Sequence, residues 1–338
     1  MQDPCAVSSL PVEEGARRLA LGYLAAATAA RARLSDSSDS EALHDYRVAL
    51  RRLRSCLRGY RKYVGSTVTR KSLRRLRRLA RGTSQSRDLE VHLAWLGEQL
   101  ASAPEPERAG ISCMTERLEQ AGGRARERML ARDERIFPRL QESLIGQLTK
   151  FRATVRLDTD PRHRSTAVVT ARRVRAASTS LRNRLHRIFG YSSEVQIHRA
   201  RVAAKNLRYL IEPFAGDRPG GTPVIEQLKS LQSASGDVHD AHVFMAELHA
   251  VLLEAETSPP GQPDVVPGVA ALIRSLRARG VHAFETVSAA WLRDRGEPFF
   301  QEVDAMAEAI GADAPPYERR LPRTRRYRRT RTLTEEHR

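Results

Sequence analysis

The chain has 338 residues and a formal net charge of +18, from 58 Lys and Arg against 40 Asp and Glu. Hydrophobic residues make up 41% of it, which is enough to bury a core in two compact units or one duplicated domain. The charge favours a polyanion or an anionic surface as partner but says nothing about fold. Cys5, Cys56 and Cys113 are odd in number and lack ligand spacing, which argues against a disulfide framework or a zinc site and fits a reducing cytosol.

Near the N-terminus, residues 19–30 form an Ala-rich apolar stretch. It is too short to span a bilayer, and it runs on into Arg31 and Arg33, which is poor for an export signal. We therefore predict a first amphipathic helix over residues 12–34 and no membrane association. Helical periodicity dominates the whole chain and alternating β-branched runs are scarce, so the predicted fold class is all-α.

The next predicted helix carries two stripes side by side. Its apolar seam is Leu43, Tyr46, Leu50, Leu53, Leu57 and Tyr60, and one residue behind it run His44, Arg47, Arg51, Arg54 and Arg58. At about 100° per residue the second stripe fits within roughly 80° of the helix, beside the seam rather than opposite it. Like charges at these spacings repel by about 0.2–0.5 kcal/mol per pair. Such a row next to a packing surface indicates an anionic ligand.

A third helix repeats the basic theme and completes the first half. Arg70, Arg74, Arg77 and Arg81 share a stripe about 60° wide, so two helices could present cations to one groove. We expect this helix to end near Asp88, a long fourth helix to follow the Pro-rich loop at 101–110, and Pro138 to open a short closing helix. The first repeat then covers about residues 12–151.

The same order returns in the second half, which we interpret as an internal duplication. A leading helix over 167–189 precedes a second seam, beside which lie His198, Arg201, Lys205 and Arg208, with Glu212 in the place of Arg58. On the third helix of the second half, the one basic residue kept from the stripe is Lys229, at the position that corresponds to Arg77. A loop at 257–268 and a closing helix opened by Pro298 complete a repeat of about 166–311, after a joint at 152–165. Residues 312–338 read as a disordered basic tail, either a solubilising end or an auxiliary polyanion clamp.

These segments resemble a known family. The first half contains His44-Asp-Tyr-Arg-Val-Ala-Leu-Arg-Arg-Leu-Arg54, Leu73-Arg-Arg-Leu-Arg-Arg-Leu-Ala80 and Ser86-Arg-Asp-Leu-Glu-Val-His92. The second half contains His198-Arg-Ala-Arg-Val-Ala-Ala-Lys-Asn-Leu-Arg-Tyr209, Leu228-Lys-Ser-Leu-Gln232 and Ser235-Gly-Asp-Val-His-Asp240. The combination resembles the CHAD family, the conserved histidine α-helical domain, over about residues 12–311. Ser84 and His239 depart from the residues usual in that family.

The resemblance implies two four-helix bundles related by a pseudo-two-fold axis around a basic central groove, with non-catalytic binding of inorganic polyphosphate. It also implies a cytoplasmic protein associated with polyphosphate granules. Motif positions carry over a ligand set, to which the stripe geometry adds Arg58 and Arg74: His44, Arg47, Arg51, Arg54, Arg77, His198, Arg201, Lys205, Arg208 and Lys229. No cofactor, metal or obligate protein partner is expected. His44 and His198 are either ligands or residues at the core edge.

Two alternatives stay open. A basic groove with an Arg-rich tail would also attract nucleic acid, although aromatic residues are only 5% of the chain and Tyr46, Tyr60 and Phe214 occupy seam positions rather than stacking platforms. The pairs His44-Asp45 and His239-Asp240 could belong to a metal-dependent phosphohydrolase, which would need further His and Asp ligands nearby. Asp88 and Asp240 are expected to cap or brace helices.

Overall fold

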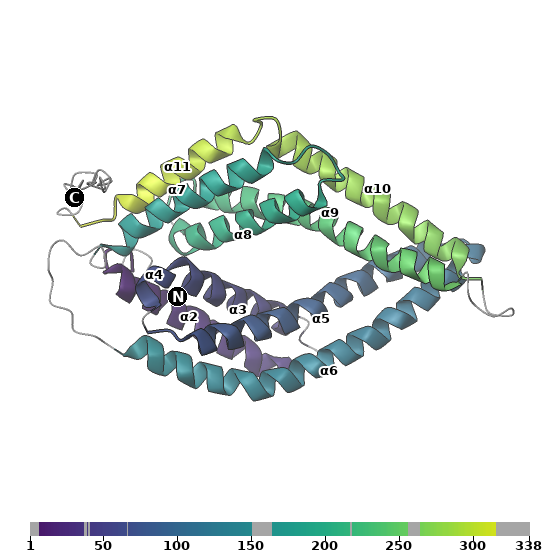
Figure 1. The fold of residues 1–338 in the computed structure, drawn as a ribbon, viewed down its shortest axis with the longest axis horizontal. Coiled ribbons are helices and arrows are strands. Elements are labelled where there is room, and N and C mark those ends of the chain that lie inside the picture. Colours follow the sequence, from purple (N-terminus) through teal and green to yellow (C-terminus); the bar gives the residue numbers. More distant parts are fainter. Residues whose placement is uncertain are drawn as a thin grey trace, which may run out of the picture.

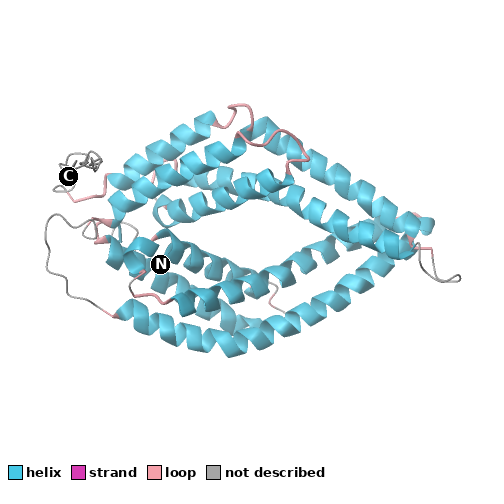
Figure 2. Ribbon diagram, in the orientation of Figure 1, coloured by secondary structure: helices cyan, strands magenta, loops and turns pink. Residues whose placement is uncertain are grey.

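A computed structural model describes residues 7–36, 39, 41–65, 67–150, 164–216, 218–255 and 264–315, and gives no side-chain description for 84–87. These residues form helices and turns, and within them the one β-type pairing is the isolated bridge between Pro11 and Ser165 (Figure 2). The predicted all-α class is confirmed. Polar caps begin α5 and α7: Thr69 accepts a hydrogen bond from the Ser72 amide, and Ser165 from the Val168 amide.

The first half contains a leading helix, the striped helix, a short turn and two long helices. They are α2 (Val12–Ala32, continued by a 3-10 turn at Arg33–Ser35), α3 (Ala42–Gly59), α4 (Arg61–Val64), α5 (Arg70–Ser102) and α6 (Glu105–Thr149).

The second half repeats this order and adds a closing helix. It contains α7 (Thr166–Leu185), α8 (Glu194–Ala215), α9 (Gly221–Ala255), α10 (Val266–Trp291) and α11 (Glu297–Gly311). The matching order agrees with two repeats, whereas the duplication itself stays an interpretation of the sequence.

Three apolar cores hold the helices together. One joins α2 and α3 to the first part of α5 and the last part of α6. A second joins α7, α8 and α11 to the first part of α9 and the last part of α10. These two are the predicted bundles, lying one above the other in Figure 1. The third core, which the sequence did not predict, lies where the far parts of α5, α6, α9 and α10 meet at the tip.

The tip depends on close backbone contact between α6 and α10. A Cβ atom added to Gly110 would lie 2.3 Å from the Val265 carbonyl oxygen, and one added to Gly268 would lie 2.1 Å from that of Glu107. No side chain fits at either position. His92 of α5 stacks on Phe244 of α9 beside this crossing, with ring centroids 4.3 Å apart. The long helices of the two halves therefore meet at the tip.

A buried polar group ties three helices of the first bundle together. Asp133 of α6 is 3% exposed. Its carboxylate accepts hydrogen bonds from the Tyr46 hydroxyl of α3 and from the Arg31 guanidinium of α2. The charge is thus paired, as a buried charge must be. Nothing in the sequence pattern indicated this pairing.

The closing helix is correct for the second half and wrong for the first. Pro298 lies in the first turn of α11, after a turn in which Arg293 and Asp294 have positive φ of 55° and 64°. Pro138, in contrast, lies inside the uninterrupted α6. A proline inside a helix removes one backbone hydrogen bond, but the apolar face continues across it through the buried Phe137, Leu140 and Leu144. Burial of that face keeps the helix whole.

The third helices also differ from prediction. They do not end near Asp88 or Asp240, because α5 continues to Ser102 and α9 to Ala255. The segments around Asp88 and Asp240 are therefore helical, and the long arms that reach the tip result from this. The leading helix of the second half ends at Leu185 rather than near 189. Most of the predicted joint, the start of the second Pro-rich loop and nearly all of the basic tail lie outside the described residues.

Candidate functional site

The apolar seam of α3 determines where its basic stripe points. Tyr46, Leu50 and Leu53 are fully buried in the first bundle. The stripe, one residue behind, therefore lies at the edge of that bundle. Figure 1 shows α3 and α5 on one side of the middle of the molecule and α8 and α9 on the other. The two striped helices belong to different bundles but to the same central region.

Direct contacts hold α3 against α8. The Arg52 guanidinium makes two hydrogen bonds to the Glu212 carboxylate, with Nη2 2.5 Å from Oε1 and Nε 3.1 Å from Oε2. Arg58 donates to the side-chain oxygen of Asn206. The sequence comparison placed Glu212 opposite Arg58 in the repeat, whereas in space Glu212 is the partner of Arg52. These contacts fix how the stripes face each other.

Lys205 of α8 is surrounded by the cations of both stripes. Burial is the largest cause that lowers its pKa, from 10.5 to about 6, followed by the positive charges of Arg51, Arg201 and Arg47. The carboxylate of Asp240 acts in the opposite direction. Arg47 and Arg51 belong to α3, so the two rows do converge. Burial and the neighbouring guanidinium groups both disfavour the charged lysine, so an anion bound here would be stabilised.

Arg54 connects α5 to the same group. Its pKa is lowered by burial and then by the positive charges of Arg58, Arg51, Arg77 and Arg81. We call the residues linked in this way the central basic cluster: Arg47, Arg51, Arg54, Arg58, Arg77, Arg81, Arg201 and Lys205. Arg81 was part of the sequence stripe but not of the predicted site, and the structure adds it. The existence of a continuous groove stays a prediction.

Two histidines lie at one end of the cluster. The rings of His198 and His239 have centroids 4.5 Å apart. The pKa of His198 is lowered by burial and then by the positive charges of His239, Arg201 and Lys205. Its Nδ1 is buried without a hydrogen-bond partner among the described residues. His239 was not a predicted site residue, although the Ser235–Asp240 motif contains it.

Glycine makes room for one arginine of the cluster. A Cβ atom on Gly236 of α9 would lie 2.9 Å from Nη2 of Arg201. Arg201 also donates from Nε to the Gln232 carbonyl oxygen of the same helix, at 3.3 Å. The α9 backbone thus positions the Arg201 guanidinium, which explains why a glycine stands in this motif.

Few carboxylates lie near these cations. The Asp88 carboxylate of α5 lies 3.4 Å from the Arg47 guanidinium of α3, and this contact braces the two helices. The Glu194 carboxylate lies 3.6 Å from Nδ1 of His239. Asp45 belongs to the His44-Asp45 pair considered for a phosphohydrolase. Its carboxylate forms an ion pair with the Arg33 guanidinium at 2.6 Å. Asp45 and Asp88 therefore brace helices.

Four predicted site residues take no part in the shifts that define the cluster. His44 and Arg74 are exposed. Arg208 places its guanidinium carbon 5.0 Å from the Tyr209 ring centroid. Lys229 is exposed and forms an ion pair with Glu226 at 2.7 Å. The role of these four residues as ligands stays a prediction.

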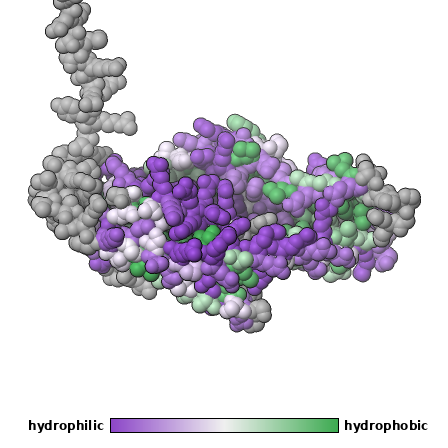
Figure 3. Space-filling model, turned by 60° about the horizontal axis from the view of Figure 1, so that its bottom comes forward, coloured by the Kyte–Doolittle hydropathy of each residue, from purple (hydrophilic) through white to green (hydrophobic). Residues whose placement is uncertain are grey.

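Figure 3 shows hydrophilic side chains gathered over the middle of one face.

Among the described residues, no group of three or more His, Cys, Asp or Glu side chains is placed to hold a metal ion. In the same part of the chain, no helix combines the length and apolar character needed to cross a bilayer.

The family can now be stated. The CHAD domain model matches residues 18–249, a span that contains α3, α5, α8 and most of α9. The chain belongs to the CHAD family. The match includes every member of the central basic cluster and both histidines, while α10 and α11 of this CHAD protein lie beyond it.

Two solved structures show the same fold as this CHAD protein. The crystal structure of the CHAD domain from the plant Ricinus communis has a TM-score of 0.60 and 20% identity, covering 89% of this chain and 93% of the other. PptA from Streptomyces chartreusis has a TM-score of 0.61 and 16% identity, covering 83% of this chain and 99% of the other. No curated protein matches the sequence.

Proposed function

We propose that this CHAD protein binds inorganic polyphosphate through the central basic cluster and does not turn it over. The observation that supports this most directly is Lys205, whose pKa is lowered to about 6 by burial and by cations from both striped helices. Bringing these charges together is unfavourable without an anion, because like charges repel in a half-buried site. A polyanion would remove that repulsion.

The residue types suit phosphate. Guanidinium groups are permanently charged and can contact phosphate oxygens in pairs. Arg47, Arg51, Arg54 and Arg58 follow one another along α3 at about one helical turn, a rise of about 5.4 Å. Successive phosphates of an extended chain could each contact one of them.

The aromatic residues give less support to nucleic acid as the ligand. Tyr46, Tyr60 and Phe214 are 0%, 3% and 1% exposed. Buried rings cannot stack with bases, and sequence-tolerant single-strand binders use such stacking. The burial of these three rings therefore favours a ligand made of phosphate alone. Binding to polyphosphate granules in the cytoplasm belongs to the same proposal.

A competition titration tests the ligand. Long-chain polyphosphate and single-stranded DNA of equal total charge compete for the protein at about 150 mM salt. We expect polyphosphate to bind more tightly. Equal or tighter binding of DNA would contradict the proposal and support the nucleic-acid alternative.

Charge reversal tests the site. Arg51→Glu and Lys205→Glu should each reduce polyphosphate binding at least tenfold while circular dichroism keeps its helical signal. Arg124→Glu is the matched control, because Arg124 is an exposed α6 arginine outside the cluster. Unchanged binding by both cluster variants would move the site elsewhere.

Incubation with Mg²⁺ or Mn²⁺ tests the absence of catalysis. We expect no orthophosphate release from polyphosphate. Release that disappears in Asp45→Asn or Asp240→Asn would instead establish the phosphohydrolase alternative.

A further inference from the structure

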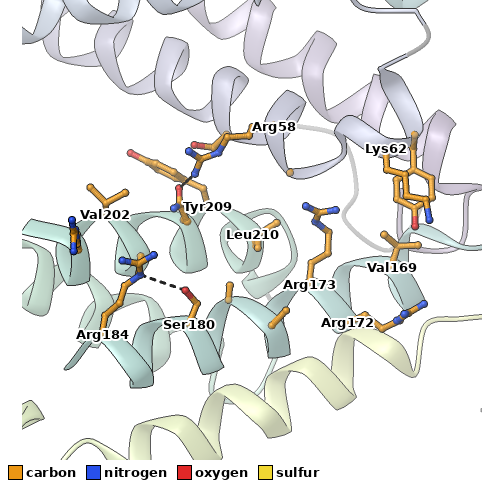
Figure 4. A pocket seen from close by; sticks show the side chains of 18 of the residues that line it. Arg58, Lys62, Val169, Arg172, Arg173, Ser180, Arg184, Val202, Tyr209 and Leu210 are labelled. Atoms are coloured by element: carbon orange, nitrogen blue, oxygen red, sulfur yellow. Dashed lines mark hydrogen bonds between the residues drawn. The ribbon is translucent and has the colours of Figure 1, made fainter. Parts of the chain in front are cut away.

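A basic cavity lies beside the central basic cluster and shares Arg58 with it. It has a volume of about 870 Å³ and lies between the C-terminal end of α3, α4, α7 and α8 (Figure 4). Its α8 lining includes Arg199, Val202 and Asn206. At about 100° per residue, this face is roughly 120° around the helix from the stripe that contains Arg201 and Lys205. Only His198 and Arg58 border both regions.

Positive charge in this cavity is not neutralised by its walls. No acidic side chain occurs among the described residues that line it. Its six arginine and lysine side chains form no ion pair with a carboxylate in the described ranges, and they come from α3, α4, α7 and α8: Arg58, Lys62, Arg172, Arg173, Arg184 and Arg199. The cavity therefore favours an anion.

Two of these cations are held in place. Arg58 donates to Asn206, and Arg184 donates from Nε to the Ser180 hydroxyl at 3.4 Å. Figure 4 shows Arg58 on one side of the cavity and Arg173 and Arg184 on the other. Guanidinium groups on opposite walls can bind one compact anion from two directions, at a lower entropic cost than free side chains.

The rest of the lining is apolar and aromatic, unlike the central basic cluster. Val169, Val202 and Leu210 lie among the cations, together with the rings of Tyr63 and Tyr209. Val202 is 39% exposed and contributes apolar surface to the wall of the cavity. A ligand made only of phosphate gains nothing from these groups, whereas a ring compound would bury them.

We propose that this cavity binds a nucleotide, with the phosphates on the arginines and the base against the apolar wall. The volume lies within the range of about 300–1,000 Å³ typical of small-molecule sites. The cavity shares Arg58 with the central basic cluster but draws its other cations from different residues, and the proposal does not depend on polyphosphate binding.

Calorimetry of the full chain carrying Lys205→Glu, the substitution that weakens the proposed polyphosphate site, tests the proposal with ATP, tripolyphosphate and adenosine at about 150 mM salt. We expect ATP to bind at least tenfold more tightly than tripolyphosphate and adenosine not to bind. Equal affinity for ATP and tripolyphosphate would overturn the proposal, because the base would then contribute nothing.

Variants separate the two sites. Arg173→Glu should abolish ATP binding and leave polyphosphate binding within threefold of the unaltered protein. Lys205→Glu should weaken polyphosphate binding and leave ATP binding within threefold. Arg172→Glu, at an exposed position, is a second variant if Arg173→Glu does not fold. Val202→Gln should weaken ATP and not tripolyphosphate. Loss of ATP binding in Lys205→Glu with retention in the cavity variants would overturn the proposal even if polyphosphate binding is confirmed.

Discussion

At the scale of single residues, the environment of Lys205 decides how the cluster responds to pH. The guanidinium groups of Arg47 and Arg51 from α3 and of Arg201 from α8 lie around it. His198 of α8 and the carboxylate of Asp240 from α9 also face it. Lys205 itself, with a pKa of about 6, is mostly neutral above pH 7.

The first prediction concerns this pH dependence. A bound polyanion favours the charged lysine and raises its pKa, so the complex holds more protons than the free protein and affinity rises as pH falls from 8 toward 6. Uptake of one proton on binding allows the affinity to change by at most about tenfold per pH unit. Isothermal titration at several pH values measures it. Lys205→Met should flatten the dependence above pH 7, and a dependence unchanged in that variant would contradict the assignment.

The second prediction concerns Asp133. Asp133→Ala leaves the Tyr46 hydroxyl without its buried partner, and should lower the free energy of unfolding by about 1–3 kcal/mol. Urea unfolding followed by circular dichroism measures the change. Asp304→Ala, at an exposed α11 position, should change it by less than about 0.5 kcal/mol. A similar loss in both variants would show that the buried hydrogen bonds contribute no specific stability.

At the scale of elements, local sequence predicts a helix better than its end. Pro138 and Pro298 were given the same role, yet only Pro298 begins a helix. The difference lies in what precedes each proline. Arg293 and Asp294 adopt the left-handed region before α11, whereas a continuous buried face crosses Pro138. Burial in a bundle, which no local rule contains, decides between the two outcomes.

The third prediction concerns the crossing of α6 and α10. Gly110→Ala and Gly268→Ala each force a Cβ against backbone and should destabilise the protein by about 1–3 kcal/mol, with faster hydrogen exchange at the tip ends of α5 and α9. Gly97→Ala is the control, since nothing lies within 4 Å of its added Cβ. It should stabilise α5 by about 0.5–1 kcal/mol. Unchanged exchange in both crossing variants would contradict this account of the tip.

At the scale of the whole molecule, the cluster draws its charges from α3, α5 and α8, so binding should show a multivalent electrostatic signature. Two bundles meet along α3 and α8 and again at the tip, which holds these helices in a fixed relation. Neither half contains the cluster alone.

The fourth prediction concerns salt. If six to ten phosphates are contacted, affinity for polyphosphate should fall by about 10³–10⁵ between 50 and 200 mM salt, on the scale known for nucleic acids. Titrations at several salt concentrations measure the slope. Arg51→Glu should make it shallower, and Arg124→Glu should not. A salt-insensitive affinity would contradict multidentate binding.

The sequence by itself determined the helices and the position of a basic stripe beside each apolar seam, because both follow from a period of 3.6 residues and from burial of the seam. It also contains the motifs that indicate the family. Only the tertiary structure decided which cations meet. Arg52 with Glu212, Lys205 among Arg47, Arg51 and Arg201, and Arg81 beside Arg54 depend on how far each helix runs and how the bundles lie against each other. The length of each helix and the packing of the bundles depend on many contacts between residues far apart in the chain. Local periodicity does not encode these contacts.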